Sequence, residues 1–515
     1  MSITSVLLEV ASIQQYVFGS NKLKENLGAS YLVENIFKDN LKSAFEEGSI
    51  NIDFDDWHEK PEKFQICDSN AEGEIGYIGG GNALLFFKEN STAKEIARLW
   101  SRDLLLKTPG LIPSIAIRDT NCSAITENFK SEMNELFNKL TNNKNQNQPQ
   151  TMLPRHGITA ECSHTGFSAE CFNSNDSTYI SSVAKSKIMN VENAKKEHKL
   201  RFKHILKDKF EFPDELNNLG QREGDNHISI VHIDGNGMGK RFRECNNLKE
   251  LRCFSNDVHN ATERSFGKLL EKIVEIYDDY YNDNFNLSYN MLPLRPIIIG
   301  GDDITFVSHG NLGIYFAKIF MEEFSKQPVY DNTKLSSCAG ISITKTKYPF
   351  YRGYELAEDL CNHAKKKARI EEEKNTSWID FHIAYGGFSG TLDEIRKKNY
   401  SASEGCLCLR PYRLEVGDHR SLDDCLNGIR QLKKQWPKSK LSEMREILEQ
   451  GIPKCEMFIK EMEYRGNFLP EVKDHPECKK KGWGEDKGTK FTPYFDMLEL
   501  MKFYPFDLDL GRIEK

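Results

Sequence analysis

One order of secondary-structure elements occurs twice along this chain, and this repetition restricts the fold more than any other feature of the sequence. Each copy predicts a strand, an amphipathic helix, a hairpin and a second helix, from the spacing of its apolar residues. The elements of the first copy cover residues 4–10, 29–47, 75–87 and 91–107, and those of the second cover residues 227–234, 248–281, 295–307 and 310–327. The matching order predicts two copies of one α/β unit.

The two hairpins differ at their tips. Residues 299–304, IGGDDI, align with residues 78–83, IGGGNA, so that Asp302 and Asp303 have no acidic counterparts in the first copy. In each hairpin the glycines permit the positive φ of a tight turn between two apolar strands. The alternative, that GGDD is only a solvated turn, has to be decided by the residues around it.

An acid also ends the first strand of each copy. Asp234 lies 302 − 234 = 68 residues before Asp302, and Glu9 lies 81 − 9 = 72 residues before Gly81. This similar spacing supports the repeat and predicts three acids at one end of the second sheet. The first copy keeps only Glu9, and we expect it to be non-catalytic, because one carboxylate does not hold two Mg²⁺ ions. We still expect its glycine turn to leave room for a nucleotide.

A glycine-rich stretch, DGNGMGK, follows the strand that ends at Asp234. Backbone N–H groups beside such glycines approach a triphosphate closely, and the start of a helix favours anions. Three neighbouring carboxylates repel one another unless a divalent cation neutralises them. Two Mg²⁺ or Mn²⁺ ions held by such acids activate a hydroxyl and stabilise a leaving pyrophosphate. The pattern therefore predicts phosphoryl transfer from a nucleoside triphosphate.

A basic cluster ends the next predicted helix. Residues 335–369 predict a strand and then a helix, and we expect Lys365 in that helix to reach a nucleotide phosphate. The alternative is that Lys365 to Lys367 and Arg369 only complement the helix C-terminus. The predicted catalytic and metal-binding residues are Asp234, Asp302 and Asp303, and the predicted nucleotide-binding residues are Gly235, Asn236, Gly237, Met238, Gly239, Gly300, Gly301 and Lys365.

Length and charge place these units in a multidomain protein. A chain of 515 residues is long enough for about three or four domains. Its net charge of -7 gives no general attraction to nucleic acid. An Asn/Gln-rich stretch over 138–150 is typical of a linker, and the pattern turns helical after residue 386. We expect a degenerate first α/β domain at 1–137, a linker and small insert at 138–222, a catalytic α/β domain at 223–385 and a helical C-terminal domain at 386–515.

Three motifs, DGNGMGK, IIIGGDDITFV and KYPFYRGYELAEDLCNHAKKKAR, resemble the second palm domain of the large polymerase/cyclase subunit of type III CRISPR interference complexes, the Cmr-type branch especially. Residues 12–36 and the hairpin YIGGGNALLFF resemble the first, degenerate palm of that subunit. The resemblance covers residues 1–385 and implies an α+β fold of two ferredoxin-like palm domains with a helical C-terminal domain. It also implies that ATP is joined into cyclic oligoadenylate when guide and target RNA bind through the complex.

The chain departs from that family in two ways. Such subunits often begin with an HD nuclease domain, but none of the 13 histidines here precedes an Asp, so we expect no cleavage of single-stranded DNA by this chain. They also often hold a four-cysteine zinc site, whereas only Cys162, His164 and Cys171 lie near one another here. Because no Cys-x₂-Cys pair is present, we expect buried thiols rather than structural Zn²⁺, with metal binding as the alternative.

The remaining cysteines and charges carry weaker expectations. Thirteen cysteines without a dense framework predict reduced thiols, and Cys406 and Cys408 are expected on one face of a core strand. The sequence has no apolar run of about 18 residues and no basic start of a secretory signal, which predicts a cytoplasmic protein without membrane contact. The basic run 185–209 is typical of a solvated helix face, with contact to RNA or a partner subunit as the alternative.

Three functions follow as hypotheses. The first is a Mg²⁺-dependent nucleotidyl cyclase/polymerase that makes a cyclic oligoadenylate-type messenger in RNA-guided antiviral defence and needs other subunits to become active. The second is a free-standing defence enzyme that makes another cyclic dinucleotide or an AMP conjugate. The third is a non-catalytic scaffold, against which the intact acids of the second copy argue. For partner contacts or its own core, the C-terminal region offers a helical stripe of Leu441, Met444, Ile447 and Leu448.

Overall fold

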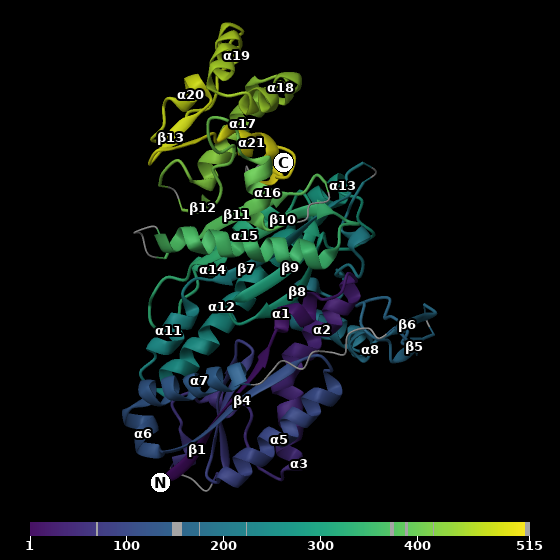
Figure 1. Ribbon diagram of the computed structural model, residues 1–515, viewed down its shortest axis with the longest axis vertical. Coiled ribbons are helices and arrows are strands. Elements are labelled where there is room, and N and C mark those ends of the chain that lie inside the picture. Colours follow the sequence, from purple (N-terminus) through teal and green to yellow (C-terminus); the bar gives the residue numbers. More distant parts are fainter. Residues whose placement is uncertain are drawn as a thin grey trace.

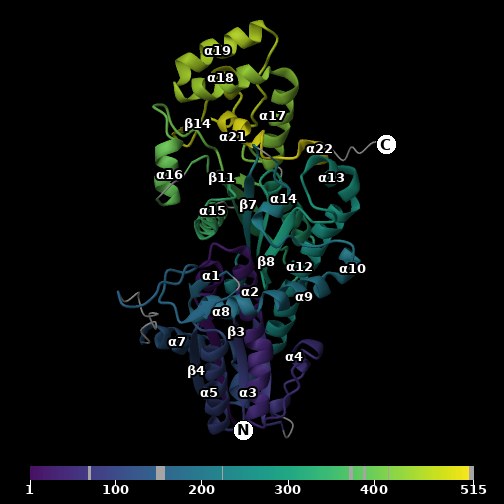
Figure 2. The ribbon, with the colours of Figure 1, turned by 90° about the vertical axis from the view of Figure 1, so that its right-hand side faces the viewer.

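Two α/β modules, an insert and a C-terminal region make up the protein. The computed structural model describes residues 1–67, 71–146, 157–174, 176–222, 224–370, 375–386, 390–415 and 417–509. From bottom to top in Figure 1 lie the first module (residues 1–146), the second module (residues 227–383) and the C-terminal region (residues 390–509). The insert (residues 157–222) lies beside the junction of the two modules (Figures 1 and 2).

Both modules contain four antiparallel strands in the same order within their sheets. The first sheet has the order β2-β3-β1-β4, and the second contains the matching order β8-β9-β7-β10. The first-sheet strands are β1 (Ser2–Ala11), β2 (Gly73–Gly79), β3 (Asn82–Phe87) and β4 (Ile112–Asn121), and their counterparts are β7 (His227–Gly235), β8 (Leu294–Gly300), β9 (Asp303–His309) and β10 (Ser337–Lys345). The repeat and the α+β, ferredoxin-like fold that the sequence predicts are therefore confirmed.

The two hairpins share an irregularity as well as a topology. The pairing of β2 with β3 skips one residue between Ile75 and Tyr77, and the pairing of β8 with β9 skips one between Pro296 and Ile298. The residue before the skip pairs with the same position of the second strand in each hairpin. Ile75 pairs with Leu85, three residues after the start of β3, and Pro296 pairs with Phe306, three residues after the start of β9. A bulge at the same position in both copies supports a duplication, because bulges are specific features rather than defects.

Helices cover both faces of each sheet. In the first module α5 packs on β1 and β4, and α7 packs on β4. The helices of this module are α1 (Ile13–Phe18), α2 (Leu23–Asn35), a π-helical turn (Ile36–Asn40), α3 (Leu41–Glu47), α4 (Asp56–Glu59), α5 (Asn90–Lys107), α6 (Cys122–Glu127) and α7 (Phe129–Gln146). Those of the second module are α11 (Met238–Glu244), α12 (Leu248–Glu275), a π-helical turn (Tyr277–Tyr281), α13 (Asn282–Asn284), α14 (Gly313–Ser325) and α15 (Phe350–Ile370).

The two modules exchange contacts in a reciprocal way. Helix α1, which follows the first strand of the first module, packs on α15 of the second. Helix α11, which follows the first strand of the second module, packs on α7 of the first. Apolar side chains of both modules also share one buried cluster, which includes Val6, Leu8, Phe18 and Leu27 from the first and Ile228, Ile230, Ile297 and Val307 from the second. This common core fixes the modules against each other.

The insert contains a short hairpin and three helices. Its elements are β5 (Cys171–Asn173), β6 (Thr178–Ile180), α8 (Ser182–Met189), α9 (Val191–Arg201) and α10 (Lys203–Leu206). Residues 138–146, which the sequence predicts as the start of a linker, instead continue α7 to Gln146. Leu140 packs into the module's core and anchors this last part of the helix. The rest of the predicted linker, 147–150, lies outside the described residues.

The C-terminal region joins the second module without a break in the core. Strands β11 (Trp378–Ile383) and β12 (Tyr412–Arg413) extend the second sheet past β10, and β12 lies in the region after residue 386 for which the sequence predicts a helical domain. The other elements are α16 (Leu392–Asn399), α17 (Leu422–Gln435), α18 (Lys438–Glu449), α19 (Ile452–Tyr464), α20 (Cys478–Lys481), β13 (Gly484–Asp486), β14 (Thr489–Phe491), α21 (Tyr494–Leu500) and α22 (Phe506–Asp509). The apolar stripe of α18 belongs to this core.

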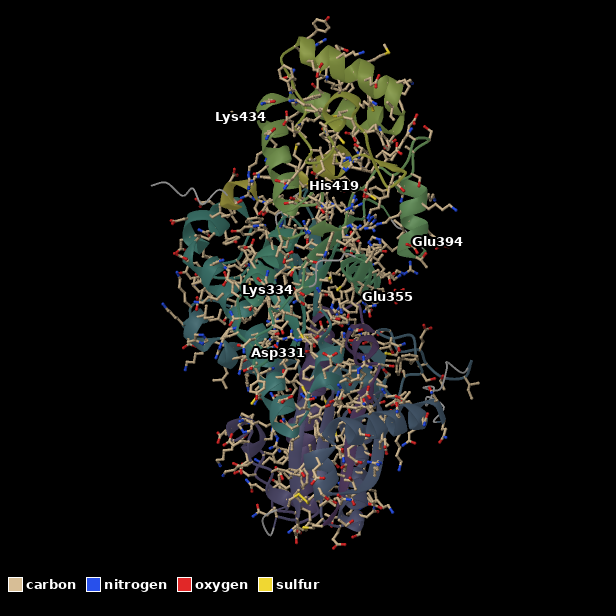
Figure 3. All side chains as sticks on the ribbon, turned by 90° about the vertical axis from the view of Figure 1, so that its left-hand side faces the viewer. Asp331, Lys334, Glu355, Glu394, His419 and Lys434 are labelled. Carbon is tan, nitrogen blue, oxygen red and sulfur yellow. A yellow bond between two sulfur atoms is a disulfide. The ribbon has the colours of Figure 1, made fainter. Side chains whose placement is uncertain are left out.

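The cysteines depart from one expectation. Cys67 and Cys122 form a disulfide in the first module, visible as a yellow bond in Figure 3, although the sequence predicts reduced thiols throughout. Cys408 is buried as expected, but it and Cys406 lie on an irregular segment rather than a strand. Among the described residues, no helix combines the length and the apolar character that a membrane span requires.

Candidate functional site

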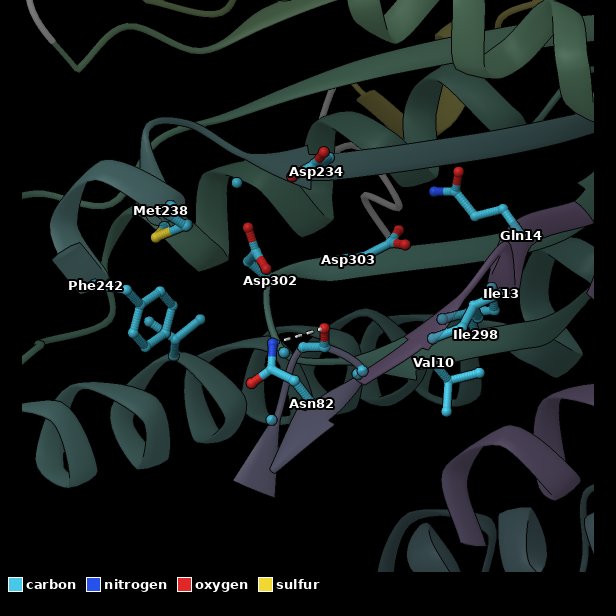
Figure 4. Close-up of a pocket in the computed structure, with 18 of the residues that line it drawn as sticks. Val10, Ile13, Gln14, Asn82, Asp234, Met238, Phe242, Ile298, Asp302 and Asp303 are labelled. Carbon is cyan, nitrogen blue, oxygen red and sulfur yellow. Dashed lines mark hydrogen bonds between the residues drawn. The ribbon is translucent and has the colours of Figure 1, made fainter. Parts of the chain in front are cut away.

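The predicted acids meet at the end of the second sheet where β7, β8 and β9 come together. Asp234 on β7 lies opposite Asp303 on β9, and the backbone N–H of Gly235 donates to the carbonyl of Asp302 at 3.1 Å. Figure 4 shows the three carboxylates around one hairpin turn. In the first module Glu9 lies opposite Asn82 in the same register. The geometry therefore equates Glu9 with Asp234, and Asn82 with Asp303.

The turn places its acids in an environment that opposes ionisation. Burial, reinforced by Asp234 and Asp303, raises the pKa of Asp302 to about 8. Burial and then Asp234 raise the pKa of Asp303 well above its ordinary value. One oxygen of Asp303, Oδ1, has no hydrogen-bond partner and lies 3.3 Å from Nδ1 of His232. A carboxylate with a free oxygen beside two further acids is a suitable oxygen donor for a hard cation.

Lys365 lies inside this cluster. Its ammonium, on α15, forms an ion pair with Oδ2 of Asp234, and both side chains are half-buried. The first module contains a matching pair, because Lys144 on α7 lies 2.5 Å from Glu9. Helices α7 and α15 follow equivalent strands, β4 and β10. The repeat therefore extends to a lysine that neutralises the acid at the end of the first strand in each module.

The glycine-rich stretch folds into a tight turn between β7 and α11. The amide of Asn236 donates to Ser336 Oγ at 3.2 Å and to the carbonyl of Thr376 at 3.0 Å, which holds the turn in place. Gly235 is required by close approach, because a Cβ there would lie 2.9 Å from the Cβ of Asp302. Gly237 has a φ of +70° and faces open space. The open backbone beyond Gly237 leaves room for a phosphate group.

A cleft of about 2720 Å³ connects this site with the first module. It is lined by both hairpin turns, by α1 and α7 of the first module and by α11, α12 and α15 of the second. The predicted residues Gly235 to Gly239, Gly300, Gly301 and Lys365 all lie in its wall. Glu355 of α15, labelled in Figure 3, marks the level at which the modules meet. The cleft is large enough for more than one nucleotide, since ligand pockets typically measure about 300–1,000 Å³.

Sequence reasoning missed a contribution of the first module to the acid cluster. Gln14 of α1 lines the cleft near Asp303 (Figure 4), and the Gln14 side chain lowers the pKa of that carboxyl against the larger effect of burial. Phe18, one turn further along α1, stacks on Tyr354 of α15 with ring centroids 3.6 Å apart. The signal for Gln14 lay in the repeat, because SIQQY follows the first strand where DGNGM follows the second.

The donor set fits Mg²⁺ or Mn²⁺, although the described residues contain no ready-made cluster of three or more metal-binding side chains. Carboxylate oxygens are the ligands that Mg²⁺ prefers. The pKa of Asp302 is raised first by burial and then by repulsion from Asp234 and Asp303, and a cation would relieve this repulsion. Asp234 is engaged by Lys365, so a cation has to displace that ammonium to use all three acids.

Of the three residues considered for zinc, His164 has other partners and the two cysteines are free thiols. Nδ1 of His164 lies 2.6 Å from Oε1 of the buried Glu25, and its Nε2 lies 2.7 Å from the ammonium of Lys22. Cys162 is a buried free thiol and Cys171 is a half-buried one. His164 thus links the insert to the first module.

The fold and the site together define a class of protein. Two palm-type α/β modules face each other across a cleft, and only one of them carries a set of acids. Residues 227–376 match the family model described as Cas10/Cmr2, second palm domain, so this part of the chain is similar to that palm domain. The resemblance stated from the sequence motifs is confirmed. No curated protein sequence matches the chain.

Solved structures of Csm1–Csm4 cassettes share the fold over nearly the whole chain. The cassette in complex with pppApApA has a TM-score of 0.53 and 13% identity, with 97% of this chain and 69% of that chain covered. The cassette with AMPPNP has a TM-score of 0.52 and the cassette with cA3 a TM-score of 0.51, with the same identity and coverage. At this identity the likeness shows the two-module fold.

Proposed function

We propose that the protein is a Mg²⁺-dependent nucleotidyl cyclase/polymerase that converts ATP into a cyclic oligoadenylate-type messenger in RNA-guided antiviral defence. The observation that carries this proposal is the acid cluster of Asp234, Asp302 and Asp303 in the wall of a cleft that both modules share. The chemistry of the similar Csm1–Csm4 cassettes, whose structures hold pppApApA, AMPPNP or cA3, supports it. Such a system acts in the cytoplasm.

Each residue then has a role in the reaction. Asp234, Asp302 and Asp303 would hold Mg²⁺ or Mn²⁺, which would supply activation of the attacking hydroxyl and neutralisation of the leaving pyrophosphate. The turn from Gly235 to Gly239 would cradle phosphates with its N–H groups. Lys365, which pairs with Asp234, would bind a nucleotide phosphate. Gly300 and Gly301 leave space for the nucleotide at the hairpin turn.

The first module contributes a surface rather than a second catalytic centre. Its only acid at the equivalent position, Glu9, is neutralised by Lys144. Its glycine turn, from Gly79 to Gly81, lines the cleft and approaches the catalytic hairpin, because a Cβ on Gly301 would lie 3.9 Å from the backbone nitrogen of Gly80. A second nucleotide bound there would face the first, and the new bond would form between the modules.

The direct test is the release of pyrophosphate. Purified protein is incubated with ATP and Mg²⁺, with and without guide and target RNA and the products of neighbouring genes. Pyrophosphate together with a cyclic oligoadenylate product supports the proposal. Release of pyrophosphate together with a different cyclic dinucleotide or an AMP conjugate would favour the hypothesis of a free-standing defence enzyme. If no pyrophosphate is released under any condition, the hypothesis of a non-catalytic scaffold is favoured.

Cation binding is expected to weaken as the pH falls below about 8. Asp302, with a pKa of about 8, has to lose its proton before it can bind a cation, so the apparent affinity for Mn²⁺ should fall about tenfold per pH unit. The folded protein binds this proton more tightly than the unfolded chain, whose carboxyl has the ordinary value of 3.8. Stability of the metal-free protein should therefore decline as the pH rises from about 4 to 8. Calorimetric titrations with Mn²⁺ at pH 6, 7 and 8 measure the first effect, and a pH-independent affinity contradicts it.

Partners are expected to raise the activity of the isolated chain at least tenfold. The described residues contain no sensor domain. Binding of other subunits and target RNA would favour the productive arrangement of the two modules. Each tenfold increase in activity requires a shift of about 1.4 kcal/mol in this equilibrium. The apolar stripe of α18 is buried, so α19, which exposes Met457 and Tyr464 one above the other, is the better surface for such contacts. Messenger synthesis by the lone chain is compared with synthesis by the co-purified complex, and full activity of the lone chain would refute this regulation.

A further inference from the structure

Two cations in the basic run of the insert turn toward the protein. The sequence predicts a solvated helix face for residues 185–209, and most lysines of the run are exposed as expected, but the expectation is wrong for the two cations with the lowest exposure, Lys187 and Arg201. Other cations of the run also have acidic partners within the chain, Lys195 with Asp214 at 2.5 Å and Lys209 with Asp278 at 3.3 Å. Lys187 and Arg201 therefore serve contacts inside the molecule.

Lys187 of α8 supports α1 of the first module. Its side chain is 2% exposed, its ammonium donates to the carbonyl of Tyr16 at 2.5 Å, and it lies 4.5 Å from the centroid of the Tyr16 ring. Carbonyls in the last turn of a helix have no partner within it, and α1 has only six residues. Lys187 supplies the missing donor, at the cost of a buried charge whose pKa falls to about 8 through desolvation.

This contact lies two residues from the side chain that reaches the acid cluster. Gln14 and the carbonyl of Tyr16 belong to the same short helix, and Gln14 lies near Asp303 (Figure 4). Because Phe18 of that helix stacks on Tyr354, α1 is held between the insert on one side and α15 on the other. A displaced α1 would withdraw the Gln14 amide from Asp303.

Arg201 of α9 supports the strand that leads into the catalytic turn. Its guanidinium forms an ion pair with Glu263 of α12, donates to the carbonyl of Ile299 on β8 at 3.3 Å, and lies 3.6 Å from Glu34 of α2. One side chain thus touches the first module and two elements of the second. Ile299 precedes Asp302 by three residues. Loss of Arg201 would remove the side chain that connects the end of β8 to α12 and to α2.

We propose that the insert is a brace that positions the acid cluster from both modules, with Lys187 and Arg201 as its two positioning residues. Lys187 fixes α1 and through it the Gln14 contact to Asp303. Arg201 fixes β8 and through it Asp302, and its planar guanidinium suits a junction of several acceptors better than an ammonium does. The effect of this brace on catalysis rests on the proposed function, whereas its effect on local order does not.

Amide hydrogen exchange of the full chain tests the brace without nucleotide. Lys187→Met keeps the aliphatic stem and removes the donor, so residues 12–19 should exchange at least tenfold faster while residues 294–303 keep their rate. Arg201→Met should produce the opposite pattern, with faster exchange over 294–303 only. Lys196→Met, at an exposed position of the same run, is the control and should change neither segment. Unchanged exchange in both segments, or equal acceleration of both by either variant, would overturn the proposal.

Kinetics then separate positioning from a merely structural role. Lys187→Met and Arg201→Met should each lower the rate of pyrophosphate release at saturating ATP at least fivefold with little change in KM, because neither side chain lines the cleft. The double variant Gln14→Leu/Lys187→Met should be no slower than Gln14→Leu alone, since Lys187 acts through Gln14. If the double variant is slower than Gln14→Leu by the factor that Lys187→Met alone produces, Lys187 does not act through Gln14. If the wild-type protein releases no pyrophosphate, the proposed function fails, and hydrogen exchange alone decides on the brace.

Discussion

Asp302→Asn is expected to lower pyrophosphate release from ATP on the order of a thousandfold, the largest effect of any single change in the chain. The substitution keeps the size of the side chain and removes one of three carboxylates that would bind the cation. It is not expected to unfold the protein, because burial already disfavours the charged form of Asp302. An amide of the same shape should instead raise the thermal midpoint of the metal-free protein at neutral pH.

Glu9→Gln is the matched control in the first module. Glu9 occupies the position equivalent to Asp234, but it pairs with Lys144 and lies outside the lining of the cleft among the described residues. Its substitution should leave pyrophosphate release within about threefold of the wild type. Equal losses from Asp302→Asn and Glu9→Gln would show that the two modules share the catalytic role, and the assignment of chemistry to the second module would then be wrong.

Arg410→Met is expected to lower the free energy of unfolding by about 3–5 kcal/mol, the largest effect on stability. The guanidinium of Arg410 is buried, lies 2.9 Å from Asp496, pairs with Glu499 and donates to the carbonyl of Phe381 at 2.8 Å. Its removal takes the shared cation from two buried carboxylates, leaves Glu499 with Arg445 at 3.3 Å, and cuts the link between α21 and β11. A hydrophobic residue of similar length fills the space but does not replace these interactions.

Urea unfolding followed by fluorescence measures this loss. Arg465→Met is the control, because Arg465 is exposed and, within the described part of the chain, pairs only with Glu461 one turn earlier, a contact worth about 0.3–0.5 kcal/mol. A change of less than 1 kcal/mol for Arg410→Met would mean that the buried acids are protonated in the wild type. Double substitution of Asp496 and Glu499 by their amides, combined with Arg410→Met, should recover part of the loss if the uncompensated charges cause it.

The local patterns of the sequence were sufficient for the repeated strands and for the acids at their ends. Alternation of apolar residues and glycine pairs are local signals. The spacing from Asp234 to Asp302, similar to that of the first copy, made it predictable that these acids lie close together. Contacts between distant segments leave no such signal. The disulfide of Cys67 with Cys122 and the addition of β12 to the second sheet both depend on tertiary packing.

Charged residues proved the least predictable from pattern alone. Lys187 and the neighbouring Lys185 and Lys196 look alike in the sequence, yet only Lys187 is among the buried polar residues. Which lysine turns inward depends on the unsatisfied carbonyl that α1 presents, and α1 comes from a segment about 170 residues earlier. Likewise, the role of Gln14 depends on how the first module packs against α15.

The two modules have features that are expected of a duplicated gene. They share a strand order and a bulge, and they pack reciprocally, α1 on α15 and α11 on α7. Two identical subunits of an ancestral homodimer would pack in this way about a two-fold axis. In a homodimer one gene encodes both centres, so a mutation that removes an acid removes it twice. Fusion of two gene copies ends that constraint. One half of the descendant can then evolve as a surface, with Asn82 at the position equivalent to Asp303, while the other half keeps its acids.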